Sequence, residues 1–294
     1  MFELFDAINQ HLWLTITVAV VFSLLIGSFL NVVIYRLPLM LKLSWKAEVD
    51  AINQDPDAFK DLPSEQPFNL SQPRSRCKSC KAQVRWYDNV PLFGYLALGG
   101  KCRDCKTAIS LRYPIVELTS GLLIGYCAYA YGFTLITLAL AVFTWVLICL
   151  TLIDYDHQLL PDNLTLPLLW LGLGVNSFGY FATLEQAVYG AIFGYLALWS
   201  VYWCFKLLTG KEGMGYGDFK LLAALGAWCG VSLLPVIILL SSVVGAVVGI
   251  TLVVLKKQDQ SKPIPFGPYL AVAGWITLLF GENLVGAYLR LFVF

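Results

Sequence analysis

The sequence GMGYGDFK, residues 213–220, places one carboxylate in a glycine-rich turn directly before a long apolar run. Glycine has no Cβ, so such a turn can approach another segment of the chain closely. A second stretch, IDYDHQLLPD at residues 153–162, also lies between two apolar runs. A carboxylate at the edge of a membrane-crossing run is costly to keep there, which makes both stretches candidate functional sites.

The apolar runs around these stretches predict an all-α polytopic membrane protein. Of the 294 residues, 58% are hydrophobic and only 13% are charged, whereas soluble domains have about a quarter of their residues charged. A helix needs about 20 apolar residues to cross a bilayer. We expect about eight transmembrane helices: one in each of the runs 12–35, 113–131, 134–153, 164–181 and 187–205, two in 219–255, and one from residue 266 onward. The last run is expected either as one tilted helix or as a helix broken near Gly281.

The basic residues indicate how these helices are oriented. Of the 20 Lys and Arg residues, 19 fall in the polar segments that eight spans place on one side, and only Arg290 falls outside them. Those segments are 36–112, 154–162, 206–220 and 256–265. Because positive charge concentrates on the cytoplasmic side, we expect the N-terminus outside and both acidic stretches at the cytoplasmic face.

The polar segment after the first run contains two CxxC pairs, Cys77 with Cys80 and Cys102 with Cys105. Two such pairs predict a site in which four thiolates bind one zinc ion, and the absence of a free ligand position makes it structural. Two disulfides are the alternative, which a cytoplasmic location disfavours. We therefore expect a first span at 1–36, a small cytoplasmic zinc-ribbon-like domain at 37–112 and a membrane domain at 113–294.

Five motifs occur in a fixed order along nearly the whole chain. They are GSFLNVVIYRLP at 27–38, the double CxxC, YPIVEL at 113–118, the ID and LPD of 153–162, and GYGDFK at 215–220. In this order and spacing the chain resembles the bacterial type IV prepilin leader peptidase/N-methyltransferase family. The glycine-rich GxGD motif alone is not specific, but the set of five is.

The resemblance implies a bifunctional enzyme of the bacterial inner membrane. Such enzymes cleave the leader peptides of type IV prepilins and type II secretion pseudopilins after a glycine, at the cytoplasmic face of the membrane. They then methylate the new N-terminal residue from S-adenosylmethionine. Their two catalytic aspartates match Asp154 and Asp218. The implied partners are these substrates and membrane lipids, and no nucleic acid is expected.

Two neighbouring carboxylates are suited to peptide hydrolysis. Two acids a few ångströms apart do not both ionise readily, so they share one proton. The charged acid takes a proton from water as the water attacks the peptide carbonyl, and the neutral acid donates to the developing oxyanion or to the leaving nitrogen. Such a pair needs neither a metal ion nor a covalent intermediate.

Three acids lie within nine residues in the stretch 153–162, and Asp154 is our candidate among them. It directly follows the apolar run, so the helix end can aim it into the bundle. Asp156 is two residues on, about 200° around a helix. Asp162 starts the next helix, where a carboxylate can accept from backbone N–H groups and complement the helix dipole. The alternatives are that Asp154 is a solvated loop acid and that Asp218 only caps the helix that follows it.

Other residues have two interpretations at this stage. Lys220 either reaches the interface as a boundary charge or pairs with the aspartates, and Glu117 either forms a helix-packing hydrogen bond or takes part in methyl transfer. No GxGxxG follows a strand, so the S-adenosylmethionine site has no recognisable pattern; our candidate is the segment 86–100.

Two other classes of function are alternatives to the enzyme. A proton-coupled transporter would favour acids near mid-span and an internal repeat, and neither is evident. A zinc-ribbon membrane scaffold would explain the cysteines but would leave both acidic stretches without a purpose.

Overall fold

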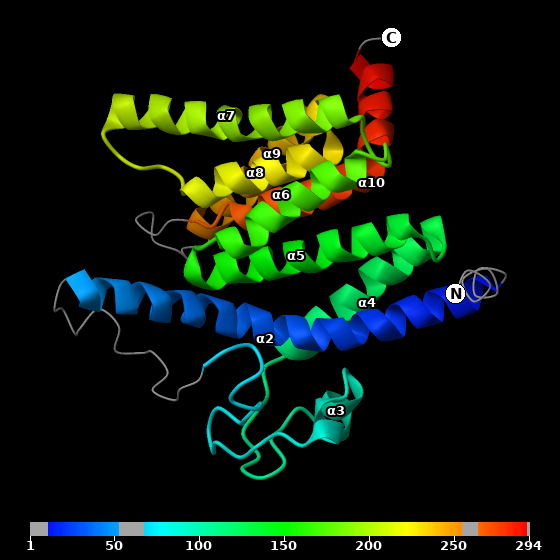
Figure 1. The fold of residues 1–294 in the computed structure, drawn as a ribbon, viewed down its shortest axis with the longest axis vertical. Coiled ribbons are helices and arrows are strands. Elements are labelled where there is room, and N and C mark those ends of the chain that lie inside the picture. The colour runs from blue at the N-terminus through cyan, green and yellow to red at the C-terminus, as the bar shows by residue number, and fades with distance from the viewer. Residues whose placement is uncertain (1–10, 53–67, 255–263, 293–294) are drawn as a thin grey trace. The chain divides into compact units, whose positions relative to one another are not determined.

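A computed structural model describes residues 11–52, 68–254 and 264–292, and these ranges are built almost entirely from α-helices (Figure 1). The described residues contain no β-strand, only two isolated bridges, Arg76 with Gln83 and Lys101 with Ala108. The predicted all-α class is thus confirmed. The chain divides into two compact units, residues 1–149 and 150–294, which are described separately below.

The first unit contains α2 (Leu12–Ile52), the 3₁₀ turn η2 (Trp86–Asn89), α3 (Phe93–Ala97), α4 (Arg112–Tyr131) and most of α5 (Leu135–His157). Helix α2 continues past Arg36 and through Pro38, so the polar segment expected after residue 36 begins as helix. The Arg36 guanidinium donates hydrogen bonds to the carbonyls of Asn69 (2.8 Å) and Pro73. The returning chain is therefore fastened to α2 at the point where its apolar run ends.

A buried polar cluster joins the three long helices of this unit. The hydroxyls of Ser23 on α2 and Ser120 on α4 lie 2.8 Å apart, and each also donates to the other's backbone carbonyl. The indole N–H of Trp145 on α5 lies within 3.1 Å of both hydroxyls. Small hydroxyl residues let helices approach closely and hydrogen-bond across an apolar interface.

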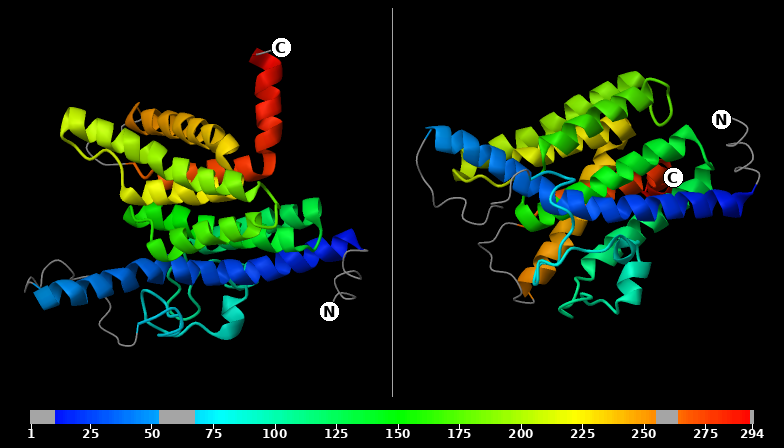
Figure 2. Two further views of the ribbon diagram at one scale, coloured as in Figure 1. Left: turned by 45° about the horizontal axis from the view of Figure 1, so that its top comes forward. Right: turned by 60° about the horizontal axis from the view of Figure 1, so that its bottom comes forward.

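The second unit comprises the end of α5 together with five further helices and one 3₁₀ turn. They are α6 (Asp162–Asn176), α7 (Leu184–Thr209), α8 (Tyr216–Cys229), η3 (Val231–Leu233), α9 (Leu234–Val254) and α10 (Gly267–Phe292). Helix α8 is the centre of the unit, because every residue from Leu221 to Cys229 is buried. It packs against α6, α7 and α10, and Figures 1 and 2 show it enclosed among these helices.

The closest helix contact in this unit is between the backbones of α7 and α8. A Cβ added to Gly190 would lie 2.2 Å from the carbonyl oxygen of Gly226, and one added to Gly226 would lie 2.1 Å from that of Gly190. At the far end of α8, the Asn176 side chain donates to the carbonyls of Ala227 (2.8 Å) and Trp228 (2.9 Å). These contacts fix the axial position of α8.

Five helices of the described residues are long and apolar enough to cross a membrane: 12–49, 135–157, 184–209, 231–252 and 267–287. This supports a multi-pass membrane protein, while the number of eight spans stays a prediction. The apolar run 219–255 does turn near Gly230, whose φ is 80°. The last run forms one helix, α10, without a break at Gly281, although Figure 2 shows that α10 changes direction along its length.

We expect Gly226→Ala to destabilise the second unit, because the added methyl would overlap a backbone atom that cannot rotate away. Overpacking of this kind costs about 1–3 kcal/mol of the free energy of unfolding. The matched control is Gly174→Ala in α6, where nothing lies within 4 Å of an added Cβ. Thermal unfolding in one detergent measures both variants, and equal midpoints would contradict the contact.

Candidate active site and metal centre

Asp154 lies in the last turns of α5 and is buried. Its Oδ2 accepts a hydrogen bond of 2.9 Å from the backbone N–H of Gly267, the first residue of α10. A Cβ at residue 267 would come within 2.6 Å of that oxygen, so a larger residue there would displace the carboxylate from the helix N-terminus. The first N–H groups of a helix point along its positive end, which makes this a favourable site for a carboxylate.

Asp218 lies in the first turn of α8 and is also buried. Its Oδ1 has no hydrogen-bond partner among the residues that the structure describes. Asp154 acts on it electrostatically, so the two predicted acids are near each other. A buried polar atom without a partner is unusual in proteins and is typical of a site that receives a ligand or water.

Leu160 brings the two acidic stretches together. A Cβ on Gly217 would lie 2.7 Å from the Leu160 Cβ, and one on Gly267 would lie 3.2 Å from its Cδ2. The same side chain therefore contacts the glycine-rich turn and the start of α10. The chain reaches this position because α5 ends at His157 and Gln158 takes a left-handed conformation, with φ of 52°.

The other two acids of the stretch 153–162 lie outside this contact. Asp156 is exposed on α5. Asp162 is in the first turn of α6, as predicted, but its carboxylate accepts from the Lys220 ammonium, at 2.7 Å to each oxygen. Lys220 therefore pairs with Asp162, so neither expectation for Lys220 describes its contact. This ion pair joins the segments that carry the two buried aspartates.

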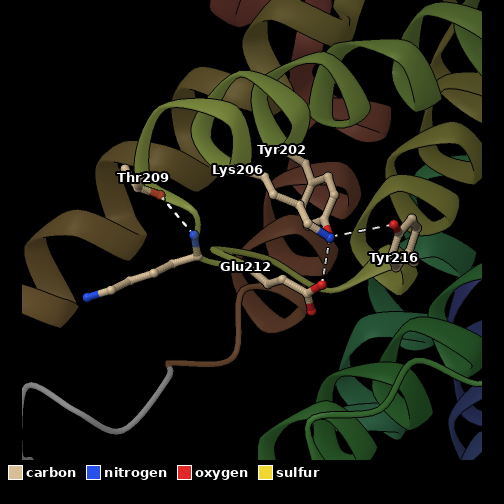
Figure 3. A network of polar contacts seen from close by, with 6 residues as sticks. Tyr202, Lys206, Thr209, Glu212 and Tyr216 are labelled. Carbon is tan, nitrogen blue, oxygen red and sulfur yellow. Dashed lines mark hydrogen bonds and ion pairs between the residues drawn. The ribbon is translucent and has the colours of Figure 1, made fainter.

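A second polar network lies in the loop before α8 (Figure 3). The Lys206 ammonium donates to Glu212 at 2.8 Å and to the Tyr202 hydroxyl at 3.1 Å. Tyr202 is in turn 3.5 Å from the hydroxyl of Tyr216, at the start of α8. The hydrogen bond from Lys206 lowers the pKa of Glu212. This network ties the end of α7 to the glycine-rich turn.

The four cysteines predicted to bind a metal come together in the first unit. Their sulfurs all lie within 4.8 Å of one another, and none forms a disulfide. Each CxxC pair folds into the same turn: Cys77 N donates to the Ala82 carbonyl and Cys102 N to the Thr107 carbonyl, both at 2.8 Å. Hydrogen bonds with Thr107 lower the pKa of Cys105 to about 6, which favours its thiolate, whereas burial and the neighbouring thiols raise the pKa of Cys80 to about 11. Four converging thiols fit a tetrahedral metal ion.

Glu117 forms a packing hydrogen bond between α4 and the segment before α3, and its alternative role in methyl transfer stays a prediction. It is buried on α4. Its Oε2 accepts from the backbone N–H of Leu92 at 2.8 Å, and it also interacts with Ser28. Its main structural effect is to hold the segment between the cysteine pairs against α2 and α4.

Comparison with known proteins covers both halves of the chain. The family described as the bacterial peptidase A24 N-terminal domain matches residues 21–131, and the type IV leader peptidase family matches residues 141–250. The chain is also 53% identical over 288 residues to a "Prepilin leader peptidase/N-methyltransferase" of Pseudomonas aeruginosa, with 98% of both chains covered. The chain belongs to the type IV leader peptidase family.

Two further relatives of this family carry the same name. That of Stutzerimonas stutzeri is 56% identical over 275 residues, covering 92% of this chain and 93% of its own. That of Aeromonas hydrophila is 55% identical over 281 residues, covering 96% of each chain. No solved structure matches this chain. In this type IV leader peptidase the cysteine cluster falls within the first matched region and both buried aspartates fall within the second.

Sequence reasoning missed three parts of the site: the Gly267 N–H, the Leu160 contact and the partner of Lys220. Residues 266–268 read Phe-Gly-Pro, and proline directly after a glycine is a signal for a helix start. That signal locates the beginning of α10. It carries no information about which carboxylate the free N–H meets.

We expect the Asp162–Lys220 pair to act as one unit in positioning the two acidic segments. Asp162→Asn and Lys220→Met should each lower the rate of peptide cleavage several-fold, and the double variant should be no worse than either single one. A partly exposed pair contributes about 1 kcal/mol or less, so complete loss of activity is not expected. Cleavage assays on the four proteins measure the coupling, with Asp156→Asn as the control. Additive losses would show that the two residues act independently.

Proposed function

We propose that this protein cleaves the leader peptide of type IV prepilins and type II secretion pseudopilins after a glycine, and then methylates the new N-terminus. The support comes from relatives that carry the name of this bifunctional enzyme over nearly their whole length. The single structural observation behind the peptidase assignment is the buried pair of Asp154 and Asp218, of which Asp218 Oδ1 has no partner among the described residues.

The two aspartates have different surroundings, and this supports different roles. Asp154 is held in one orientation by the Gly267 N–H, which also stabilises negative charge on its Oδ2. Asp218 has one oxygen without a partner among the described residues, and this oxygen can bind water or substrate. We infer that the charged carboxylate removes a proton from water as the oxygen bonds to the peptide carbonyl carbon. The neutral carboxyl then donates its proton to the amide nitrogen, the C–N bond breaks, and an acid and an amine are released.

The glycine-rich turn supports close approach of a peptide. A Cβ added to Gly215 would lie 3.7 Å from Asp218 Oδ2, so on this side the turn presents backbone without a side chain to the carboxylate. We propose that the extended backbone around the scissile bond occupies this space. The distribution of Lys and Arg supports placing it at the cytoplasmic face of the inner membrane.

The methyltransferase activity uses S-adenosylmethionine as methyl donor and the freed N-terminal amine as acceptor. The resident metal is proposed to be zinc, held by Cys77, Cys80, Cys102 and Cys105, whose tetrahedral all-sulfur set is the usual structural zinc site. Zinc would stabilise the fold of residues 68–112 and leave no ligand position for substrate.

We expect Asp154→Asn and Asp218→Asn each to lower prepilin cleavage by about 100-fold or more, the usual range for loss of a general acid or base. Asp156→Asn should be nearly silent because that side chain is exposed. Cleavage of a purified prepilin by the folded proteins measures this. Activity that survives in Asp154→Asn but is lost in Asp156→Asn would show that the wrong carboxylate was chosen.

The same variants distinguish the two activities. Asp218→Asn should still methylate a pilin supplied without its leader, since methyl transfer requires only the free amine and the donor. Transfer of labelled methyl groups from S-adenosylmethionine measures it. Loss of both activities in a folded Asp218→Asn protein would indicate one shared site.

We expect one zinc ion per chain, lost in the double variant Cys77→Ser/Cys102→Ser. Because metal binding and folding are coupled in such modules, residues 68–112 should also become sensitive to protease. Elemental analysis measures the metal, and Cys204→Ser, an exposed cysteine on α7, is the control. Full zinc in the double variant would contradict the assignment.

A further inference from the structure

The segment between the two cysteine pairs exposes large apolar side chains. Trp86 is 82% exposed, and Phe93 and Leu96, one turn apart on α3, are 71% and 72% exposed. Soluble surfaces carry single apolar side chains without consequence, but three large ones in eleven residues indicate a surface that another apolar phase covers. We call Trp86, Phe93 and Leu96 the apolar triplet.

The position of this segment along α2 can be read from its contacts. The Leu92 N–H is bonded to Glu117, and a Cβ on Gly27 would lie 2.9 Å from the Glu117 Cα. Gly27 precedes Arg36, which marks the end of the apolar run of α2, by a distance on the order of 10 Å at 1.5 Å per residue. Leu92 therefore lies beside the apolar part of α2. Residues 68–112, which contain both cysteine pairs, are called the cysteine module. Figure 1 shows α3 displaced from the rest of this module toward the N-terminal end of α2.

The backbone conformation of Leu92, directly before α3, is energetically unfavourable. Leu92 has a φ of 59°, in the left-handed region that non-glycine residues rarely adopt. The hydrogen bond of its N–H to the buried Glu117 carboxylate is a compensating interaction. The fold thus fixes the start of α3 beside the apolar part of α2.

The positive charge of the segment matches an anionic lipid surface. Residues 68–112 contain nine Lys or Arg and two Asp residues, a formal excess of seven positive charges, or five when four thiolates bind one zinc ion. Asp88, one of the two acids, is itself bonded to Arg103 at 2.9 Å. Anionic lipid headgroups attract basic segments by about 1 kcal/mol for each Lys or Arg at the surface. Tryptophan is enriched at the same interface.

We propose that the apolar triplet is a membrane anchor of the cysteine module: Trp86, Phe93 and Leu96 insert into the edge of the bilayer, and the surrounding cations bind anionic phospholipid headgroups. The module is then a peripheral membrane element fixed beside α4, instead of a domain that extends into solvent. This inference uses only the contacts and charges of α2, α4 and residues 68–112, and it does not depend on the peptidase or methyltransferase assignment.

The test measures the fluorescence of Trp86 in the full-length protein in lipid nanodiscs. The Trp86 signal is the difference between the wild type and Trp86→Phe, which removes the contribution of the other tryptophans. In nanodiscs of phosphatidylcholine and phosphatidylglycerol, we expect phospholipids brominated near the carbonyl to quench this signal and acrylamide to leave it unquenched. Without phosphatidylglycerol, quenching by the brominated lipid should be at least about two-fold weaker, because the cations lose their partners.

Phe93→Gln/Leu96→Gln should expose Trp86 to acrylamide, whereas the matched control Phe93→Leu, which keeps the apolar surface, should not. Quenching by acrylamide alone in the wild type would overturn the anchor, and equal lipid quenching in both nanodiscs would overturn the assignment to anionic lipid. Protection of Trp86 that requires added S-adenosylmethionine, with no effect of lipid, would show that a cofactor covers this surface and would also overturn the proposal. The variants need not be active for any of these measurements.

Discussion

The 150–294 unit depends on one contact, the meeting of the α7 and α8 backbones at Gly190 and Gly226. Because no side chain separates the two helices, α8 packs closely into this unit, and its residues Leu221 to Cys229 are buried. In its first turn Asp218 and Phe219 are buried as well, whereas Tyr216 is exposed. A carboxylate in such a place is costly to maintain, which is consistent with a residue kept for chemistry.

The two buried aspartates have the same side chain but different hydrogen-bond surroundings. Asp154 is oriented by the N–H of Gly267, whereas Asp218 Oδ1 has no partner among the described residues. Two neighbouring carboxyl groups in different environments are the usual basis for an acid and a base in one site. The glycine at 267 is as necessary to this arrangement as the acids, since a Cβ there would occupy the position of the carboxylate.

The 1–149 unit uses buried hydrogen bonds for a related purpose. Glu117 accepts from Leu92 and so fixes the cysteine module beside α2 and α4, while Ser23 and Ser120 hold those two helices together. In an apolar surrounding such bonds are specific, because an unpaired polar group costs more than a mismatched apolar one. The module's position thus follows from a few polar contacts rather than from a large core of its own.

The helical class, the cysteine cluster and the two acidic stretches are predictable from the chain, because apolar run length and CxxC spacing are local properties. The turn near Gly230 is predictable in the same way. The partners of those residues are visible only in the folded structure. Asp154 and Gly267 are 113 residues apart, and Asp162 and Lys220 are 58 apart. No local pattern specifies such pairs, since they depend on how closely helices pack, and that closeness is set at glycines whose partners are visible only in the folded chain.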